Sequence, residues 1–179
     1  PETQIIRDFL GTREIKNCLN YHTYSNLLIY PYGALEHETA DSVIFREYAS
    51  DMTAFNGYSA GTDQQTVGYS TRGNSDDYMY DGDTVLSGGK IFAMTPEVGS
   101  SSDGFWPQQS RIFPLAIENL YPNLYYAWVA GEYVSMENAS FNVPYFNPGD
   151  NVELTASFKN KGLSDASNIS VSLTSLSQY

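Results

Sequence analysis

Four residues of this sequence carry side chains that could do chemistry, and each lies at a strand end or in a loop. His22 follows a strand-like run over residues 15–21, and Glu97 follows another apolar run. Tyr69 and Asp76 lie in a segment rich in Gly, Ser and Thr. Histidine can bind a metal, a carboxylate can serve as a general base, and a phenol can donate a hydrogen bond. Taken singly, each residue has a simpler structural interpretation, such as a surface tyrosine among fifteen.

The composition predicts a folded, acidic protein. The chain has 179 residues, 41% of them hydrophobic, so a packed core is feasible. Nine Lys and Arg against 21 Asp and Glu give a net charge of −12. Nucleic acid is therefore excluded as a partner, because phosphate binding needs positive charge. An acidic surface is compatible with a secreted protein or with basic substrates.

Cysteine and histidine are scarce. Cys18 is the single cysteine, so an intrachain disulfide and a cysteine-based zinc site are excluded, and we expect a buried structural thiol. The only histidine besides His22 is His37, which we expect at the surface. The sequence has no apolar run near 18 residues, so we expect no membrane span. It opens on Pro-Glu-Thr-Gln without a signal peptide, which is typical of the inside of a longer protein.

Hydrophobic periodicity predicts alternating helices and strands up to about residue 131. The expected elements are helix 2–10, strand 15–21, strand 27–30, helix 36–55, a long loop 56–87, strand 90–95, loop 99–104 and helix 110–131, kinked at Pro122. The expected inner stripe of helix 36–55 is Ala40, Val43, Ile44, Tyr48 and Met52. A loop as long as 56–87 in a compact domain is usually functional.

The composition changes from about Ser140. A turn signal, Asn147-Pro148-Gly149-Asp150, precedes two alternating runs, over residues 152–158 and 169–173. This segment resembles the first strands of the immunoglobulin-like modules appended to secreted bacterial enzymes. Such a module needs about 80–100 residues, so we expect a truncated one. The predicted division is therefore 1–134 and 135–179, and the location that the resemblance implies is secreted, periplasmic or cell-surface.

Four motifs, in order, resemble those of the zinc metallocarboxypeptidases of the carboxypeptidase A/B type. The motifs are His22-Thr23-Tyr24-Ser25 followed by Leu27-Leu28-Ile29-Tyr30-Pro31-Tyr32-Gly33; Tyr69 followed by Gly73-Asn74-Ser75-Asp76-Asp77-Tyr78; Thr95-Pro96-Glu97-Val98-Gly99; and Gly104-Phe105-Trp106-Pro107. Tyr78 replaces the family's usual Trp. The resemblance covers roughly residues 1–130.

The resemblance implies a role for each matched residue. His22 would be a ligand of Zn²⁺, and Glu97 would take a proton from the attacking water and pass it to the leaving amine. Tyr69 would cap the carboxylate of the substrate from a mobile loop. Asp76 would form the floor of the pocket for the last side chain, where an acid goes with Lys or Arg preference; otherwise it merely caps the helix that starts there.

Three further residues are expected to contact substrate. Gly73 belongs to the loop motif that carries Asp76. Tyr24 and Phe105 would line subsites further along the peptide, although either could equally be a core residue. The partners implied are the C-termini of peptides or proteins.

The sequence departs from the family pattern at its beginning. The other two zinc ligands of the family form a His-x-x-Glu motif, which does not occur here. The arginines that bind substrate are also missing, since Arg7, Arg13 and Arg46 lie in no matching motif. We therefore expect the C-terminal half of a peptidase domain, inactive and largely free of metal by itself. Its cut sheet edge would favour self-association.

The predicted fold class is α/β: the C-terminal portion of a mixed, mostly parallel sheet with helices on both faces, plus a short β-sandwich-like tail. The leading functional hypothesis is a zinc carboxypeptidase that prefers C-terminal Lys or Arg. The alternatives are a noncatalytic peptide- or glycan-binding relative that has lost the metal, and a structural module for display on a cell surface.

Overall fold

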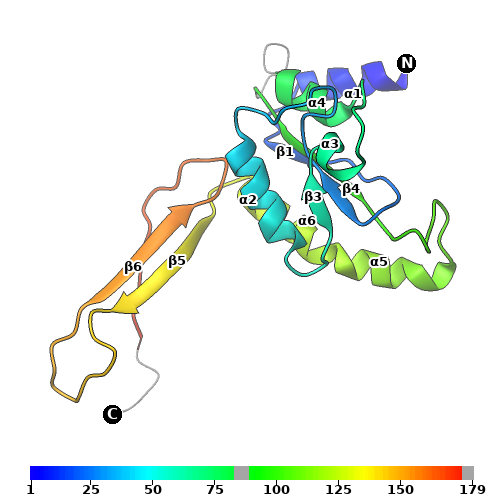
Figure 1. Cartoon of the computed structure of the whole chain (residues 1–179). Helices are drawn as coiled ribbons and strands as arrows, with labels where there is room; N and C mark the ends of the chain where they lie inside the picture. Colours follow the sequence, from blue (N-terminus) through cyan, green and yellow to red (C-terminus); the bar gives the residue numbers. More distant parts are fainter. Residues whose placement is uncertain (83–88, 175–179) are drawn as a thin grey trace. The chain divides into compact units, whose positions relative to one another are not determined.

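The computed structural model describes residues 1–82 and 89–174. The chain divides into two compact units, Pro1–Tyr126 and Ala127–Tyr179, and each is described by itself. The first unit contains a sheet with helices, and the second contains a β-hairpin (Figure 1). No helix among the described residues is long and apolar enough to cross a membrane.

The first unit is built on a four-stranded sheet in the order β1-β4-β2-β3. The strands are β1 (Asn17–Leu19), β2 (Leu27–Ile29), β3 (Ser59–Gly61) and β4 (Phe92–Glu97). β1 pairs with β4 and β2 with β3 in parallel, while β2 and β4 are antiparallel. The prediction of a mixed, mostly parallel sheet is confirmed. β1 is shorter than the expected 15–21, and β4 extends two residues further, to Glu97.

One face of β4 packs on two helices. Ala93, together with Ile91 just before the strand, forms a buried cluster with Leu10 of α1 (Glu2–Gly11) and Met79 of α4 (Ser75–Asp81). Cys18 of β1 packs against this cluster but is only partly buried, whereas a buried thiol was expected. Burial raises the pKa of its thiol, so the unreactive thiol form is favoured.

The opposite face of β4 packs on α2 (Ser42–Thr53) and α6 (Leu120–Val129). The Phe92 ring lies 5.2 Å from that of Phe45, centroid to centroid. The Tyr126 hydroxyl donates a hydrogen bond to the Phe92 carbonyl. Strand residues alternate between faces, so one six-residue strand is covered by helices on both sides, as predicted.

Helix α2 begins at Ser42 rather than at residue 36, and its buried face differs from the predicted stripe. The buried residues of α2 are Phe45, Tyr48, Ala49 and Met52. Val43, expected inside, is 68% exposed. Tyr48 and Met52 fix the direction of the inner face, and Phe45 and Ala49 lie on it at spacings of three and four residues. Val43 lies off that face.

The segment 56–87 was expected to be structureless, and that prediction was wrong for its described part. It contains β3, the short helix α3 (Asp63–Thr66) and α4. Thr62 and Gln65 form a reciprocal capping box at the start of α3. The pattern Thr-x-x-Gln predicts such a start and was overlooked among the polar residues. Residues 83–88 lie outside the described part.

The expected helix 110–131 is two helices, and the break is at Asn119, not at Pro122. A 3₁₀ turn, η2 (Gln109–Arg111), leads into α5 (Ile112–Glu118), and α6 follows. The Asn119 side chain donates to the Leu115 carbonyl at 2.9 Å. Pro122 lies in the first turn of α6, where its missing N–H costs little.

The second unit contains an antiparallel hairpin of β5 (Val134–Phe141) and β6 (Leu154–Asn160), with an irregularity between Met136 and Asn138. The predicted run 152–158 therefore contributes to a strand, whereas β5 was not predicted. Residues 169–173 form no strand, although they were expected to, and Ile169, Val171 and Leu173 are exposed. Alternation alone does not make a strand without a neighbour to pair with.

Candidate active site

Five of the seven predicted site residues line one pocket of the first unit. They are His22, Tyr69, Gly73, Asp76 and Glu97. The cavity volume is about 370 Å³, which lies within the range of small-molecule sites. Residues from the ends of β1 and β4, from the loop after α3 and from α4 thus meet at one place, although up to 75 positions separate them in the sequence (22 to 97).

The backbone holds His22 and Glu97 side by side. They form a parallel bridge that continues the β1–β4 pairing beyond β1. The His22 N–H donates to the Pro96 carbonyl at 2.9 Å, and the Val98 N–H donates to the His22 carbonyl at 2.9 Å. The two residues therefore occupy neighbouring positions at the carboxyl ends of the parallel strands β1 and β4, and His22 is exposed.

The surroundings of Glu97 favour its protonated, neutral form more strongly than bulk water would. Burial raises the pKa of its carboxyl group, the neighbouring His22 opposes this shift, and the charge of Asp63 adds to it. A carboxylate with a raised pKa accepts and returns a proton more readily near neutral pH. The position and the pKa shift together suit a proton-transfer role.

Asp76 is a buried carboxyl group in the lining of the same pocket, only 4% exposed. Burial raises its pKa to about 6, and the charges of Asp77 and Asp63 act in the same direction. The Thr95 hydroxyl donates to its Oδ2 at 3.2 Å. The N-cap of α4 is Asn74, so Asp76 lies within the first helical turn and is not the cap.

A second buried carboxylate, Asp63, holds the loop that carries Tyr69. The Thr71 hydroxyl makes a short hydrogen bond to Asp63 Oδ2, and the Asn74 amide donates to the same oxygen at 3.2 Å. Gly33 lies against this group, since a Cβ there would come within 1.9 Å of Asn74 Nδ2. Tyr69 itself is 61% exposed, so its ring is free to approach a bound peptide.

Asp77 joins α4 to the turn around Gly33. Its two carboxylate oxygens accept hydrogen bonds from the N–H groups of Gly33 and Ala34, each at 2.9 Å. This pair of bonds fixes the start of α4, and with it Asp76, relative to the segment that follows β2.

The two remaining predicted residues lie outside the pocket lining. Tyr24 and Phe105 pack edge to face, with ring centroids 4.9 Å apart. Phe105 is 75% exposed, so it is not a core residue. The contact joins the segment after His22 to the loop after Glu97, and their role in substrate binding stays a prediction.

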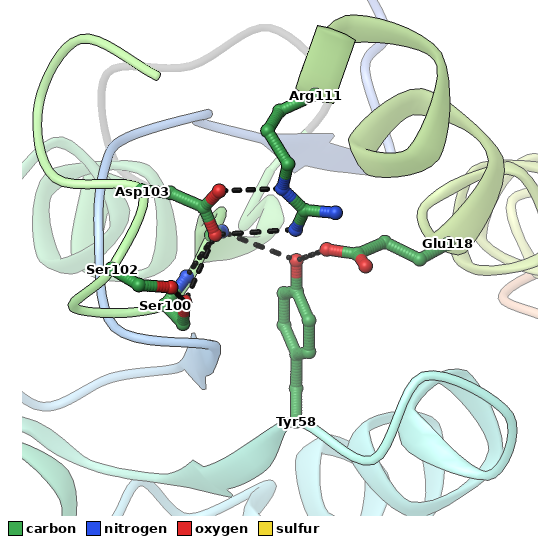
Figure 2. Close-up of polar contacts among 7 residues, drawn as sticks. Tyr58, Ser100, Ser102, Asp103, Arg111 and Glu118 are labelled. Atoms are coloured by element: carbon green, nitrogen blue, oxygen red, sulfur yellow. Dashed lines mark hydrogen bonds and ion pairs between the residues drawn. The ribbon is translucent and has the colours of Figure 1, made fainter. Parts of the chain in front are cut away.

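The loop between Glu97 and Phe105 is tied to the helices that follow (Figure 2). Arg111 donates to Asp103 through Nε at 2.6 Å and through Nη2 at 3.2 Å. This guanidinium and the Ser100 N–H keep the pKa of Asp103 well below its usual range. Asp103 Oδ2 also accepts a hydrogen bond from the Ser100 N–H at 2.9 Å. The Asp103 carboxylate thereby links Ser100, near the end of β4, to Arg111 of η2.

Tyr58 also contacts the loop between Glu97 and Phe105. Its hydroxyl donates to Glu118 at 2.6 Å and accepts from Asn119 at 3.1 Å (Figure 2 shows the bond to Glu118). The Gly99 N–H approaches the same hydroxyl at 3.5 Å. Burial and the neighbouring Glu118 raise the pKa of Tyr58 to about 12, so it acts as a neutral hydrogen-bonding group.

Sequence reasoning missed Asp63, Thr71, Asn74 and Thr95, which also line the pocket. The capping pattern of Thr62 and Gln65 would have placed Asp63 at a helix start. No sequence pattern indicates that Thr95 faces Asp76, since that contact comes from the tertiary packing of α4 on β4.

The described residues do not form a complete metal centre. Within them, no group of three or more His, Cys, Asp or Glu side chains could hold a metal ion. His22 is a single potential ligand. His37 is exposed and packs edge to face on Tyr32, as its predicted surface position requires. The residues present therefore do not by themselves fit a catalytic zinc, which takes three protein ligands.

Comparison with known proteins agrees with the motifs. The chain is 31% identical over 108 residues to a zinc carboxypeptidase of Saccharothrix mutabilis subsp. capreolus, covering 57% of this chain and 24% of that protein. Two solved structures of thrombin-activatable fibrinolysis inhibitor, one of them bovine and bound to tick carboxypeptidase inhibitor, match with a TM-score of 0.57 and 27% identity. Each match covers 71% of this chain, and 44% and 32% of the respective structures.

The chain thus spans less than half the length of these relatives. A model of the zinc carboxypeptidase family matches residues 1–122, which include every predicted site residue. The chain belongs to the zinc carboxypeptidase family.

Proposed function

We propose that this chain is the pocket-bearing part of an exopeptidase that removes the C-terminal residue of peptides, with a preference for Lys or Arg. The observation that carries the proposal is the backbone pairing of His22 with Glu97 at the ends of β1 and β4. Both residues line the pocket that the buried Asp76 also lines. That arrangement supports the assignment of proton transfer to Glu97 and of selectivity to Asp76, because both line one pocket.

Glu97 is the proposed general base and acid. It takes a proton from the water that attacks the scissile carbonyl and delivers it to the leaving amine, which separates the terminal residue. Its raised pKa supports this exchange. Tyr69, exposed on the loop above the pocket, is proposed to close on the terminal carboxylate by donating its hydroxyl.

The charge of the pocket supports a basic terminal residue. Among the described residues, its lining contains three carboxylates, Asp63, Asp76 and Glu97, and neither Lys nor Arg. A cationic side chain that enters the pocket would neutralise part of this charge. Its N–H groups would donate to the carboxylates in place of the hydrogen bonds that it made with water. Removing one partner of such a buried pair costs about 2–5 kcal/mol, which is ample for discrimination against neutral residues.

His22 is proposed as one ligand of a zinc ion whose other ligands lie outside this chain. One ligand does not hold a catalytic metal tightly, so we infer that the chain alone releases no C-terminal residue. Secretion, which the resemblance of the β-hairpin unit to appended modules implies, belongs to the same proposal.

The test uses a longer protein that supplies a His-x-x-Glu segment upstream of this chain. Release of C-terminal Lys, Arg, Phe and Leu from otherwise identical peptides would be measured with and without a chelator. The proposal expects chelator-sensitive release of Lys and Arg, and none from the chain alone. Chelator-sensitive release confined to Phe and Leu would refute the basic preference.

A matched pair of variants separates the pocket from a general charge effect. Asp76→Asn removes the pocket charge while keeping an acceptor for Thr95, and Asp8→Asn removes an exposed charge on α1. Only the first is expected to lower kcat/KM for Lys and Arg. Absence of any release from a folded, zinc-supplied protein would instead favour a noncatalytic binding relative.

A further inference from the structure

Asp63 is a buried charge of the pocket that the motif comparison does not explain. It is 4% exposed and lines the same cavity as Asp76. It comes from α3, whereas Asp76 comes from α4, so the two carboxylates reach the cavity from different elements. Burying a second acid beside a first is costly, which suggests a purpose beyond packing.

The hydrogen bonds of Asp63 use only one side of its carboxylate. Within residues 1–82 and 89–174, the side-chain bonds from Thr71 and Asn74 both end on Oδ2. A carboxylate has about four acceptor positions on its two oxygens, so Oδ1 keeps its capacity for a ligand. The loop contacts fix the orientation of the group while leaving that capacity in place.

The charge of Asp63 acts on the second carboxyl group proposed to bind the terminal side chain. The two groups line one cavity, and Asp63 contributes to raising the pKa of Asp76. A cation that enters this cavity therefore interacts with both carboxylates at close range.

We propose that Asp63 is a second specificity-determining residue, which together with Asp76 selects a guanidinium, and hence a C-terminal arginine, over the ammonium of lysine. This inference rests on the proposed function. A guanidinium presents five donors in a planar fork and can bond two carboxylates at once, whereas an ammonium is a compact point charge. A pocket with one carboxylate pairs with either cation, whereas a second carboxylate favours the guanidinium, which can donate to both.

Binding is the direct test, because it does not depend on turnover. The longer protein carrying Glu97→Gln, which blocks proton transfer, is titrated calorimetrically with three peptides that differ only in a C-terminal Arg, Lys or Gln. We expect Arg to bind about 10-fold more tightly than Lys, and Asp63→Asn to remove most of that difference. Equal binding of Arg and Lys by the protein without further substitution would overturn the proposal.

A control variant and the neutral peptide separate charge from positioning. Asp63→Asn removes the charge but keeps an acceptor oxygen for Thr71 and Asn74, so binding of the Gln peptide should persist while the Arg-to-Lys ratio falls. Asp8→Asn removes an exposed charge on α1 that lies outside the pocket lining, and it should leave the ratio intact. Loss of the ratio in Asp8→Asn, or an equal loss for all three peptides in Asp63→Asn, would show that Asp63 does not select the cation.

The outcome is distinguishable from failure of the proposed function. If the protein with Glu97 intact releases no residue while the Asp63-dependent preference for Arg persists in the binding experiment, the selectivity inference stands and the exopeptidase proposal falls. If the protein releases C-terminal residues but binds Arg and Lys equally, the exopeptidase proposal stands and the selectivity inference falls.

Discussion

Asp76 shows how a single buried carboxyl group can cost stability. Its pKa rises from 3.8 to about 6 on folding, chiefly because of burial. The charges that face it are Asp63 and Asp77, and it in turn raises the pKa of Cys18 and of Tyr126. A carboxylate kept in such a place is poised to pair with a cation that arrives from solution.

The sign of the pH dependence follows from that shift. The folded state binds the proton more tightly than the unfolded chain, so the contribution of Asp76 is full near pH 4 and is lost as pH rises through about 6. We predict that Asp76→Asn stabilises the chain above pH 6 by about 1–2 kcal/mol. The measurement is urea unfolding at either end of this range. Equal destabilisation at both ends would contradict the account.

Gly33 carries a second prediction, because its lack of a side chain makes room for the Asp63 group. A Cβ at Gly33 would come within 1.9 Å of Asn74, 2.6 Å of Asp63 and 2.9 Å of Thr71. We expect Gly33→Ala to cost about 1–3 kcal/mol in the free energy of unfolding. Gly131→Ala, where a Cβ meets nothing within 4 Å, is the control and should be near neutral. Equal effects would show that the loop moves aside freely.

At this scale, the structure brings together residues that the sequence presents in contiguous motifs, while their roles stay predictions. His22, Tyr69, Gly73, Asp76 and Glu97 all line the pocket. Asp63 and Thr95 were missed because their roles arise from the meeting of α3, α4 and β4, which no local pattern records. Tyr24 and Phe105 contact each other rather than the pocket.

At the scale of elements, the hydrogen-bonded groups around residues 99–104 connect β4 to α5. The Asp103–Arg111 pair closes the turn, and Tyr58 joins the loop to Glu118 (Figure 2). The same hydroxyl accepts a hydrogen bond from Asn119. Since Glu97 lies two residues before Gly99, these contacts hold the end of the strand that positions it. They also explain why α5 and α6 break at Asn119, whose side chain serves Leu115 and Tyr58.

Tyr58→Phe tests this connection. The substitution keeps the buried ring but leaves Glu118 and Asn119 without the hydroxyl, so we expect a loss of about 1–3 kcal/mol in unfolding free energy. Tyr69→Phe removes an exposed hydroxyl from the same unit and should change it by less than about 0.5 kcal/mol. Urea unfolding of both variants gives the comparison. A neutral Tyr58→Phe would mean that the hydroxyl does not support the loop.

Elements with strong periodicity were predicted well, and those with short or polar signals were not. α1 and β2 lie within a residue or so of their expected ranges. The sequence of segment 56–87 predicts a loop because β3 and α3 are three and four residues long, too short for a periodic signal. The kink expected at Pro122 was wrong because proline is harmless in a first helical turn.

At the scale of the whole molecule, apolar side chains remain exposed on several helices of the first unit. Ile5, Ile6 and Phe9 of α1 and Ile112, Phe113 and Ile117 of α5 are exposed. Surfaces of this kind usually contact another protein surface. Among residues 1–82 and 89–174, strands β1 and β3 are the outer strands of the sheet. The chain covers only 44% and 32% of its solved relatives, which agrees with a missing neighbour.

We therefore predict that the purified chain self-associates. Sedimentation velocity over a range of concentrations should show growing oligomers, and the paired substitution Phe113→Glu with Ile117→Glu should reduce them. The paired substitution Glu36→Gln with Asp8→Asn, at exposed polar sites, should not. A single monomeric species at all concentrations would contradict this prediction.

The central claim is that Glu97 transfers the proton in a carboxypeptidase reaction. The most direct measurement compares Glu97→Gln with the unsubstituted residue in the longer, zinc-supplied protein, using a peptide that ends in arginine. The account predicts that kcat falls about 10²–10⁴-fold while the peptide binds with unchanged affinity. Turnover that survives the substitution, in a folded protein with intact binding, would contradict it.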